Sequence, residues 1–147
     1  MKRYPGYKRK PFYYETDKMG IIHHSNYIRW FEEARVDMLE FVDYPFERIE
    51  QEGIIVPVLS VSSTYKDMVR FGDEVLIHPI ISKYTGTRLN FEYQIINEET
   101  GTTTTTGTSE HCFLSSETNR LIHLKRQNPE LHQLFLDYYT KISEEAQ

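Results

Sequence analysis

A lone acid, Asp17, stands between an aromatic stretch and a glycine turn, just before the most strongly helical segment of the chain. A carboxylate in such a loop can act as a nucleophile or as a general base on a carbonyl compound. The helix that starts near His24 offers free backbone N–H groups and the positive end of its dipole, which suit a developing oxyanion. This combination favours acyl transfer. An ordinary turn or capping role for Asp17 is the alternative, because Asp is common before Gly turns.

Two adjacent histidines, His23 and His24, do not predict a metal site. Neighbouring residues usually point apart, and no HxxxH motif or Cys/His set accompanies them. The backbone N–H at the helix start therefore matters more than the imidazole rings. No GxGxxG or P-loop motif indicates a nucleotide cofactor, so we expect neither a metal nor a cofactor. The helical glutamates Glu32, Glu33 and Glu40 are interpreted as a solvated face, with an inward-pointing second acid as the alternative.

The elements that must position Asp17 follow from hydrophobic periodicity. An aromatic strand is expected over 7–15, a loop over 16–24, and a helix over 25–42 capped by Ser25 or Asn26. A short helical piece follows over 46–52. The period then changes to two, and five strands are expected, at 54–65, 74–84, 88–97, 102–115 and 120–125. The threonine-rich run 102–106 is interpreted as an exposed strand that begins at a turn.

Short, turn-rich connections between these strands imply antiparallel neighbours. We therefore expect an α+β fold in which one curved antiparallel sheet wraps around the broad apolar helix. Asn128-Pro129-Glu130 is a typical helix start and predicts a last helix over about 129–144, packed on the sheet edge or on a partner subunit. No repeat or linker interrupts the chain, so residues 1–147 are expected to form one domain with a core of about 8–125.

Composition limits the class of protein and of partner. The chain has 147 residues, 39% of them hydrophobic and 14% aromatic, which supports a packed globular protein. A net charge of −5 argues against nucleic acid as the main partner. No apolar run approaches the roughly 20 residues that span a bilayer, so no membrane insertion is expected. The single cysteine, Cys112, allows no internal disulfide and suits a reducing cytoplasm, the expected location.

The motif formed by Asp17, Gly20, His24, Asn26 and Tyr27 resembles that of hotdog-fold acyl-CoA thioesterases of the 4-hydroxybenzoyl-CoA thioesterase type. The following Phe31-Glu32-Glu33-Ala34-Arg35 and the segment 65–75 extend the resemblance, which covers about residues 8 to 125. It implies five or six strands wrapped around the long helix. It also implies a homodimer or homotetramer with active sites between subunits.

The resemblance further implies hydrolysis of an acyl-CoA thioester to the free acid and coenzyme A. Asp17 would be the nucleophile or general base, the backbone N–H of His24 would polarise the carbonyl, and Gly20 would allow close approach. Substrate binding falls to a set of residues along the rim and beside the acyl group: Tyr27, Ser63, Thr64, Thr87 and Arg88. Family members often have Tyr or Phe where this chain has His23, which changes the polarity expected for the acyl pocket.

Two other functions are compatible with the same residues. One is a thioesterase that acts on acyl groups bound to a carrier protein, which the net acidity of the chain mildly disfavours. The other is a non-catalytic module that only binds acyl-CoA. Basic residues near strand ends are candidates to bind the phosphates of a large thioester carrier, with ordinary surface charge as the alternative. They are Lys66, Arg70, Lys83 and Arg88.

Overall fold

The computed structural model describes residues 2–145, with side chains up to Lys141. The strands are β1 (Tyr7–Arg9), β2 (Ile54–Ile55), β3 (Val58–Tyr65), β4 (Val75–Tyr84), β5 (Arg88–Asn97), β6 (Thr103–Cys112) and β7 (Leu114–Ser115). The helices are α1 (Ser25–Phe41), α2 (Phe46–Gln51), α3 (Leu124–Gln127), α4 (Pro129–Glu145) and the short 3-10 helix η1 (Tyr13–Glu15).

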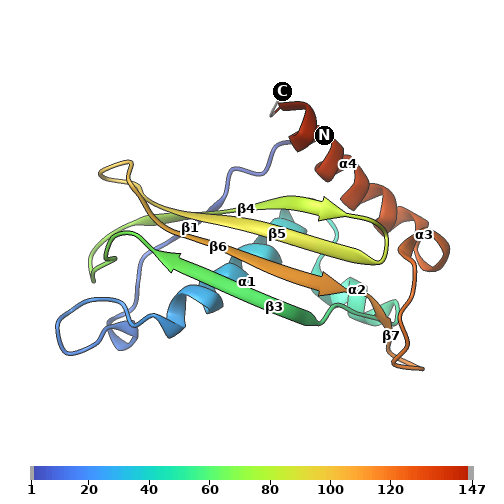
Figure 1. The fold of residues 1–147 in the computed structure, drawn as a ribbon, viewed down its shortest axis with the longest axis horizontal. Coiled ribbons are helices and arrows are strands. Elements are labelled where there is room, and N and C mark those ends of the chain that lie inside the picture. Colours follow the sequence, from blue (N-terminus) through green and yellow to red (C-terminus); the bar gives the residue numbers. More distant parts are fainter. Residues whose placement is uncertain (1, 146–147) are drawn as a thin grey trace.

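Five strands form one antiparallel sheet in the order β1-β4-β5-β6-β3 (Figure 1). β3 pairs with β6 over its length, from Val58 opposite His111 to Tyr65 opposite Thr105. The helix α1 contacts both edge strands, β1 and β3, as well as β4. A sheet whose two edges touch the same helix must curve around that helix. The expected architecture, an antiparallel sheet wrapped around one long helix, is therefore confirmed.

The strand predicted over 7–15 was too long. Regular pairing with β4 ends at Arg9, and residues 13–15 form the turn η1, in which the Glu15 N–H donates to Phe12 O at 2.9 Å. Pro11 has no N–H to offer a neighbouring strand, so it is a natural end for the pairing. The turn that follows carries Glu15 into the interior, where it is 3% exposed.

Three other predicted strands also differ from the structure. The strand expected at 54–65 is divided at Pro57, which cannot donate to a ladder, so that β2 pairs with β7 while β3 pairs with β6. The strand expected at 102–115 is likewise divided after Cys112. The strand expected at 120–125 is wrong. Only a single bridge joins Leu121 to Leu114, and the chain then turns into α3.

The threonine-rich run lies in an interior strand of the sheet, so the exposed strand expected for it is wrong. β6 has β5 on one side and β3 on the other, and Thr104 and Thr105 are fully buried. In the same strand, a Cβ at Gly107 would lie 2.5 Å from the Phe31 ring and 2.7 Å from the Ser62 carbonyl oxygen. Only glycine therefore lets α1 approach the sheet closely at this point.

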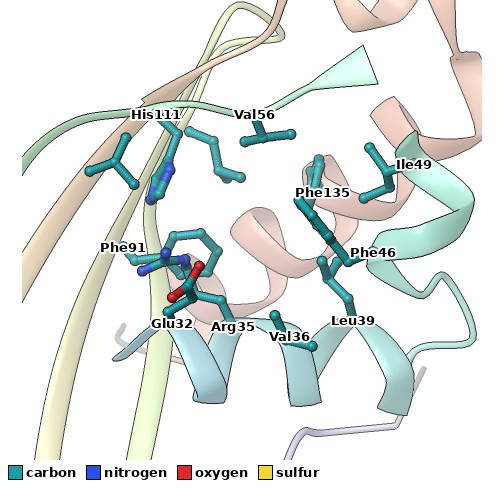
Figure 2. Close-up of a pocket in the computed structure, with 12 residues that line it drawn as sticks. Glu32, Arg35, Val36, Leu39, Phe46, Ile49, Val56, Phe91, His111 and Phe135 are labelled. Atoms are coloured by element: carbon teal, nitrogen blue, oxygen red, sulfur yellow. The ribbon is translucent and has the colours of Figure 1, made fainter. Parts of the chain in front are cut away.

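The helix α1 leaves part of the sheet uncovered beside its middle turns. A cavity of about 190 Å³ lies between α1, α2 and the sheet, and Figure 2 shows the side chains that line it. Most of them are apolar, such as Leu39, Val56 and Phe91. Three polar side chains, Glu32, Arg35 and His111, also line it.

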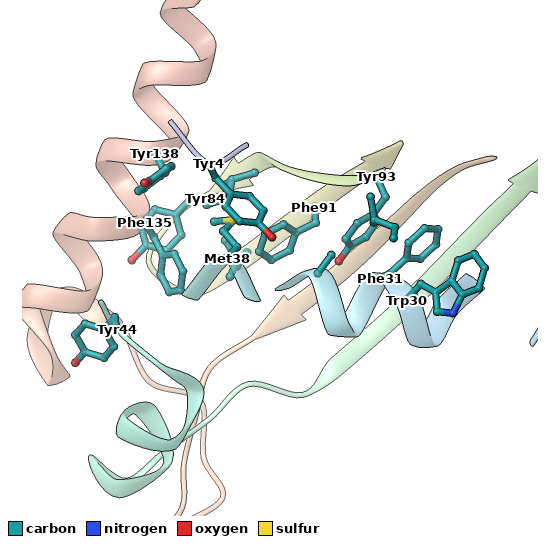
Figure 3. Packing of buried hydrophobic residues seen from close by; sticks show 14 of the residues in the cluster. Tyr4, Trp30, Phe31, Met38, Tyr44, Tyr84, Phe91, Tyr93, Phe135 and Tyr138 are labelled. Carbon is teal, nitrogen blue, oxygen red and sulfur yellow. The ribbon is translucent and has the colours of Figure 1, made fainter. Parts of the chain in front are cut away.

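The core is rich in aromatic rings contributed by α1, the sheet and α4 (Figure 3). Trp30 and Phe31 are completely buried, and the Phe31 ring stacks on Tyr93 with centroids 4.3 Å apart. Full burial of each such side chain stabilises the fold by about 1.5–3 kcal/mol. This packing fixes the position of α1, and with it the position of the loop that carries Asp17.

The last helix begins as the sequence predicted. Asn128 Oδ1 accepts from the Leu131 N–H at 3.1 Å, which makes Asn128 the cap of α4. The helix packs against β4, where Phe135 meets Tyr84 at 5.6 Å between ring centroids. Within residues 2–145, no helix combines the length and the hydropathy needed to cross a membrane.

Candidate active site

Asp17 lies in a tight turn that joins η1 to α1. Its N–H donates to Ile21 O at 2.8 Å, and Gly20, with φ of +73°, donates to Asp17 O at 3.2 Å. Its carboxylate oxygen Oδ1 accepts from the Met19 N–H at 2.8 Å and from the Ile21 N–H at 3.3 Å. Asp17 therefore does have the turn role considered for it, but the turn uses only one carboxylate oxygen, Oδ1. Oδ2 has no hydrogen-bond partner among the described residues, and the side chain is exposed.

Backbone hydrogen bonds hold this loop against the segment between β3 and β4. The Ile22 N–H donates to Val69 O at 2.9 Å, and the Phe71 N–H donates to Gly20 O at 3.2 Å. Ile21 forms an isolated bridge with Arg70. The loop therefore has a defined conformation in the single chain, although Asp17 itself faces outward.

A buried ion pair beneath the loop was missed by the sequence analysis. Glu15 is 3% exposed, and its carboxylate accepts from Arg9 Nη1, from the Phe12 N–H at 2.7 Å and from Trp30 Nε1 at 2.9 Å. Arg9 also pairs with Glu33 at 2.6 Å. We call Arg9, Glu15, Trp30 and Glu33 the anchor network. The sequence signal for this ion pair is an acid, Glu15, inside an aromatic run and six residues after Arg9.

The anchor network keeps Glu15 ionised and joins the loop to the second and third turns of α1. Burial opposes ionisation, but hydrogen bonds from Arg9, from Phe12 and from Trp30 outweigh it and hold the pKa of Glu15 below its ordinary value. Asn26 adds a second connection, since its Nδ2 donates to Glu15 O at 3.0 Å and to His23 O at 3.2 Å. Both oxygens of this carboxylate already accept hydrogen bonds. Glu15 is therefore suited to support the loop and not to react.

The start of α1 presents one unused backbone donor. The His23 N–H donates to Glu15 O at 2.9 Å, whereas the described residues include no acceptor for the His24 N–H. The cap predicted at Ser25 or Asn26 is wrong. His24 is the N-cap, Ser25 already lies in the helix, and Asn26 donates to the loop instead. His23 takes over part of the capping, because its Nδ1 accepts from the Ser25 N–H at 3.2 Å.

Two tyrosines form the wall beside this donor. Tyr27 on α1 is buried, and its ring lies 5.0 Å from that of Tyr65 at the end of β3. Tyr65 Oη donates to His24 O at 3.3 Å. Burial raises the pKa of Tyr27, with the Val69 N–H acting against the shift, so this hydroxyl stays neutral at physiological pH.

The structure separates the predicted coenzyme A residues into two groups. Ser63 and Thr64 lie beside Tyr65, at the end of β3 that meets His24. Thr87 and Arg88 lie at the opposite end of the sheet, because Arg88 pairs with Cys112 while Ser63 pairs with Gly107. At about 3.3 Å per residue, the two groups are roughly 16 Å apart along β6. One chain therefore does not bring them together.

An exposed carboxylate oxygen and a free N–H at a helix start are two groups that chemistry at a carbonyl carbon requires. The carboxylate can attack the carbon or take a proton from water. The N–H can stabilise the negative charge that develops on the oxygen. The His23 and His24 rings stack at 4.2 Å between centroids, and neither is needed for these two roles.

Comparison with known proteins identifies relatives across most of the chain. The model of the thioesterase-like superfamily matches residues 13–136. YneP of Bacillus subtilis, provisionally named an acyl-CoA thioesterase, is 29% identical over 120 residues, which are 82% of this chain and 86% of YneP. YbgC of Escherichia coli O6:H1, an acyl-CoA thioester hydrolase, is 28% identical over 88 residues, or 60% of this chain and 66% of YbgC.

A solved structure agrees with these matches. The DHNA-CoA thioesterase of Staphylococcus aureus has a TM-score of 0.87 to this chain at 32% sequence identity. The match covers 96% of this chain and 93% of that one. The likeness therefore extends over nearly the whole chain.

Proposed function

This chain belongs to the thioesterase-like superfamily, and we propose that it hydrolyses acyl-CoA thioesters with Asp17 as its reactive carboxylate. Its relatives YneP and YbgC are named for acyl-CoA thioester hydrolysis, and the S. aureus structure is a thioesterase that acts on a CoA ester. The observations that carry the proposal are that Asp17 Oδ2 and the His24 N–H at the start of α1 both lack a hydrogen-bond partner among the described residues.

In the proposed reaction, the thioester carbonyl oxygen accepts a hydrogen bond from the His24 N–H. Asp17 either attacks the carbonyl carbon or removes a proton from a water molecule that attacks it. The C–S bond then breaks and coenzyme A leaves as a thiolate. If Asp17 attacks, water subsequently hydrolyses the acyl-enzyme anhydride. Both routes give the free acid and coenzyme A, and neither needs a metal or a redox cofactor.

A second copy of the chain would complete the site along β3. This strand is at the edge of the sheet, and its outer side has no neighbour within the described residues. Its side chains include Val58, Leu59 and Val61, which are 40–50% exposed. An apolar unpaired edge of this length favours pairing with another strand. We therefore propose a homodimer through β3, with a homotetramer as a further level of assembly.

Pairing of two β3 strands would also reunite the coenzyme A residues. Antiparallel pairing places the start of one β3 beside the end of the other. Ser63 and Thr64 of one copy would then lie at the same end of the joined sheet as Arg88 of the partner subunit. The guanidinium group suits charge-assisted contacts with the phosphates of coenzyme A.

The test is an Asp17→Asn variant in a thiol-release assay with a panel of acyl-CoA esters. Asn keeps an oxygen that can accept from Met19 and Ile21, so the turn is preserved while the charge is lost. We expect kcat to fall by about 10²–10⁴-fold, with the free energy of unfolding unchanged. Turnover close to that of the wild type would refute the role of Asp17.

Two controls separate the alternatives. The same acyl groups on a carrier protein test whether coenzyme A is the preferred carrier, since a carrier-protein thioesterase would hydrolyse them faster. Tight binding of acyl-CoA without any release of thiol would instead identify a binding module.

A further inference from the structure

The side chain of Asn26, the second residue of α1, is buried at the start of that helix. It is 6% exposed, and its Nδ2 donates to two backbone oxygens, Glu15 O at 3.0 Å and His23 O at 3.2 Å. A carbonyl oxygen can only accept, so the amide atom that faces both oxygens must be the nitrogen with its two hydrogens. The surroundings therefore fix the orientation of this amide.

One of these two acceptors belongs to the peptide group that carries the His24 N–H. A peptide group is planar and rigid, so the position of the His23 carbonyl determines the direction of the His24 N–H. The His23 oxygen accepts from Asn26 Nδ2 and also from the Asn26 backbone N–H at 3.0 Å. Asn26 thus holds one end of the peptide group twice. The other end is the N–H that has no acceptor among the described residues.

The second acceptor, Glu15 O, ties Asn26 to a fixed part of the fold. The same oxygen also accepts from the His23 N–H at 2.9 Å. The Glu15 carboxylate accepts from Trp30 Nε1 at 2.9 Å, and Trp30 is completely buried in the core (Figure 3). A continuous path of hydrogen bonds therefore runs from the core through Glu15 and Asn26 to the peptide group of His24.

The carbonyl on the other side of His24 is held separately. His24 O accepts from the Tyr27 N–H at 3.3 Å and from Tyr65 Oη at 3.3 Å. These bonds do not orient the His24 N–H, because the peptide group between His23 and His24 can rotate about the line joining the two Cα atoms while His24 O stays in place. The bonds from Asn26 to His23 O oppose this rotation.

The same bonds also affect the strength of the donor. Hydrogen bonds to a peptide oxygen draw electron density from the conjugated nitrogen, so the N–H at the other end becomes a better donor. The effect adds to that of the helix dipole, whose positive end lies at the same place.

We propose that Asn26 is a positioning residue for the oxyanion donor, which fixes and polarises the peptide group between His23 and His24. The inference rests on the proposed function, in which the His24 N–H binds the thioester carbonyl oxygen. Asn26 does not touch the substrate. A donor accelerates the reaction when it meets the oxygen in its transition-state position, so a small misplacement is costly. In the alternative, a structural role, Asn26 would do no more than pair buried carbonyl oxygens.

A double-mutant cycle between Asn26 and His24 distinguishes these two roles. Asn26→Leu has nearly the same shape and lacks both donors. We expect it to lower kcat by about 10- to 100-fold in the thiol-release assay and to change KM by less than about threefold. His24→Pro removes the N–H itself. When Asn26→Leu is added to His24→Pro, kcat should fall by less than about a further threefold, because no donor remains to be positioned.

Asn128→Leu is the matched control. Asn128 is also buried, and its Nδ2 donates to Tyr44 Oη at 2.7 Å, but it lies at the start of α4. Both leucine variants should lower the free energy of unfolding, because each leaves buried polar groups unpaired. Of the two, Asn26→Leu alone should lower kcat. Circular dichroism and urea unfolding establish that each variant is folded, and the smaller Asn26→Ser takes its place in the cycle if Asn26→Leu does not fold.

Infrared spectroscopy measures the donor without turnover. The probe is a ketone analogue of the CoA ester that the wild type hydrolyses fastest, with CH₂ in place of the sulfur and ¹³C in the carbonyl group. A hydrogen bond to the carbonyl oxygen lowers its stretching frequency. We expect a lowered frequency on the wild type and on Asn128→Leu, a smaller change on Asn26→Leu, and none from this donor on His24→Pro.

The results separate the role of Asn26 from the proposed function. If the wild type hydrolysed no CoA ester, or if His24→Pro were fully active, the proposed function would be refuted and the inference with it. Three results would overturn the positioning role alone: wild-type kcat in Asn26→Leu, an equal loss of kcat on adding Asn26→Leu with and without His24→Pro, or an unchanged carbonyl frequency on Asn26→Leu.

Discussion

Two buried polar networks contact α1, and they differ in how completely their atoms are paired. In the anchor network, both oxygens of Glu15 accept hydrogen bonds, and Arg9 is shared between two carboxylates. A second network joins Arg35, Tyr93, Ser109 and His111, and its last atom, His111 Nδ1, has no hydrogen-bond partner within residues 2–145. A saturated network stabilises the fold, whereas a buried polar atom without a partner costs stability.

The same difference separates Glu15 from Asp17, two carboxylates only two residues apart. Glu15 is buried with its hydrogen bonds filled, and Asp17 is exposed with one oxygen unused. If this distinction is correct, variants of saturated groups should lower stability, and variants of unsaturated groups should lower activity. Changes to Glu15, His24, His111 and Glu33 test this distinction.

The largest effect on stability is expected for Glu15→Gln. The carboxylate faces three donors, so the amide nitrogen of Gln must point at one of them and leave Arg9 less well paired. We expect the free energy of unfolding to fall by about 3–5 kcal/mol, measured by urea denaturation. Glu47→Gln on the exposed surface of α2 is the control. A loss no larger than that of the control would show that the anchor network is dispensable.

The second prediction concerns the backbone donor at His24. Its φ of −56° is compatible with proline, and its N–H makes no hydrogen bond in the fold. His24→Pro should therefore remove the oxyanion donor and lower kcat by about 10²–10³-fold in the thiol-release assay. His24→Ala, which keeps the N–H and removes the ring, should stay close to the wild type. A large loss with His24→Ala would assign the role to the imidazole instead.

The third prediction is a pH dependence of stability that comes from His111. Its pKa is about 4 in the folded state, below the ordinary value of 6.5, so the unfolded chain binds more protons between these values. Stability should therefore be complete above about pH 6.5 and should fall by about 3 kcal/mol as the pH is lowered to 4. Urea unfolding at several pH values measures this loss of stability, and His111→Gln should remove the part of the pH dependence that comes from His111.

Glu15 contributes to the pH dependence of stability only at lower pH, since its folded pKa lies below the ordinary range for Glu.

The smallest effect is expected at the rim of the anchor network. Glu33 pairs with Arg9, but its side chain is 34% exposed and Arg9 keeps its bond to Glu15 when Glu33 is neutralised. Glu33→Gln should cost less than about 1 kcal/mol in urea unfolding, because solvent screens such a pair. If Glu33→Gln lowered the free energy of unfolding as much as Glu15→Gln does, the exposure of a carboxylate would not predict its contribution to stability.

Much of the fold could be predicted from sequence because its signals are local. The period of α1, the alternation in β4 and β5, and the cap at Asn128 each depend on neighbouring residues. The errors concern tertiary pairing. Whether a segment continues as a strand depends on its partner, so the ends of β1 and β3 were misjudged, and Leu121 makes a single bridge where a strand was expected.

The candidate site was predictable to a similar extent. The motif around Asp17, Gly20 and His24 is continuous in sequence, and the structure gives it a defined turn. Glu15, Tyr93 and His111 could not be identified, because their importance depends on burial and on partners up to 58 residues away. The threonine run was misjudged for the same reason, since nothing in its composition indicates that β6 has a neighbour on both sides.

The strand order β1-β4-β5-β6-β3 has a consequence for folding during synthesis. The consecutive strands β4, β5 and β6 can pair as soon as each is made, but β1 and β3 come earlier in the chain and must wait for β4 and β6. The ribosome therefore releases α1, with its apolar surface, before any sheet exists to cover it. Until β6 has emerged, β3 has no partner in the sheet and the apolar surface of α1 stays partly uncovered.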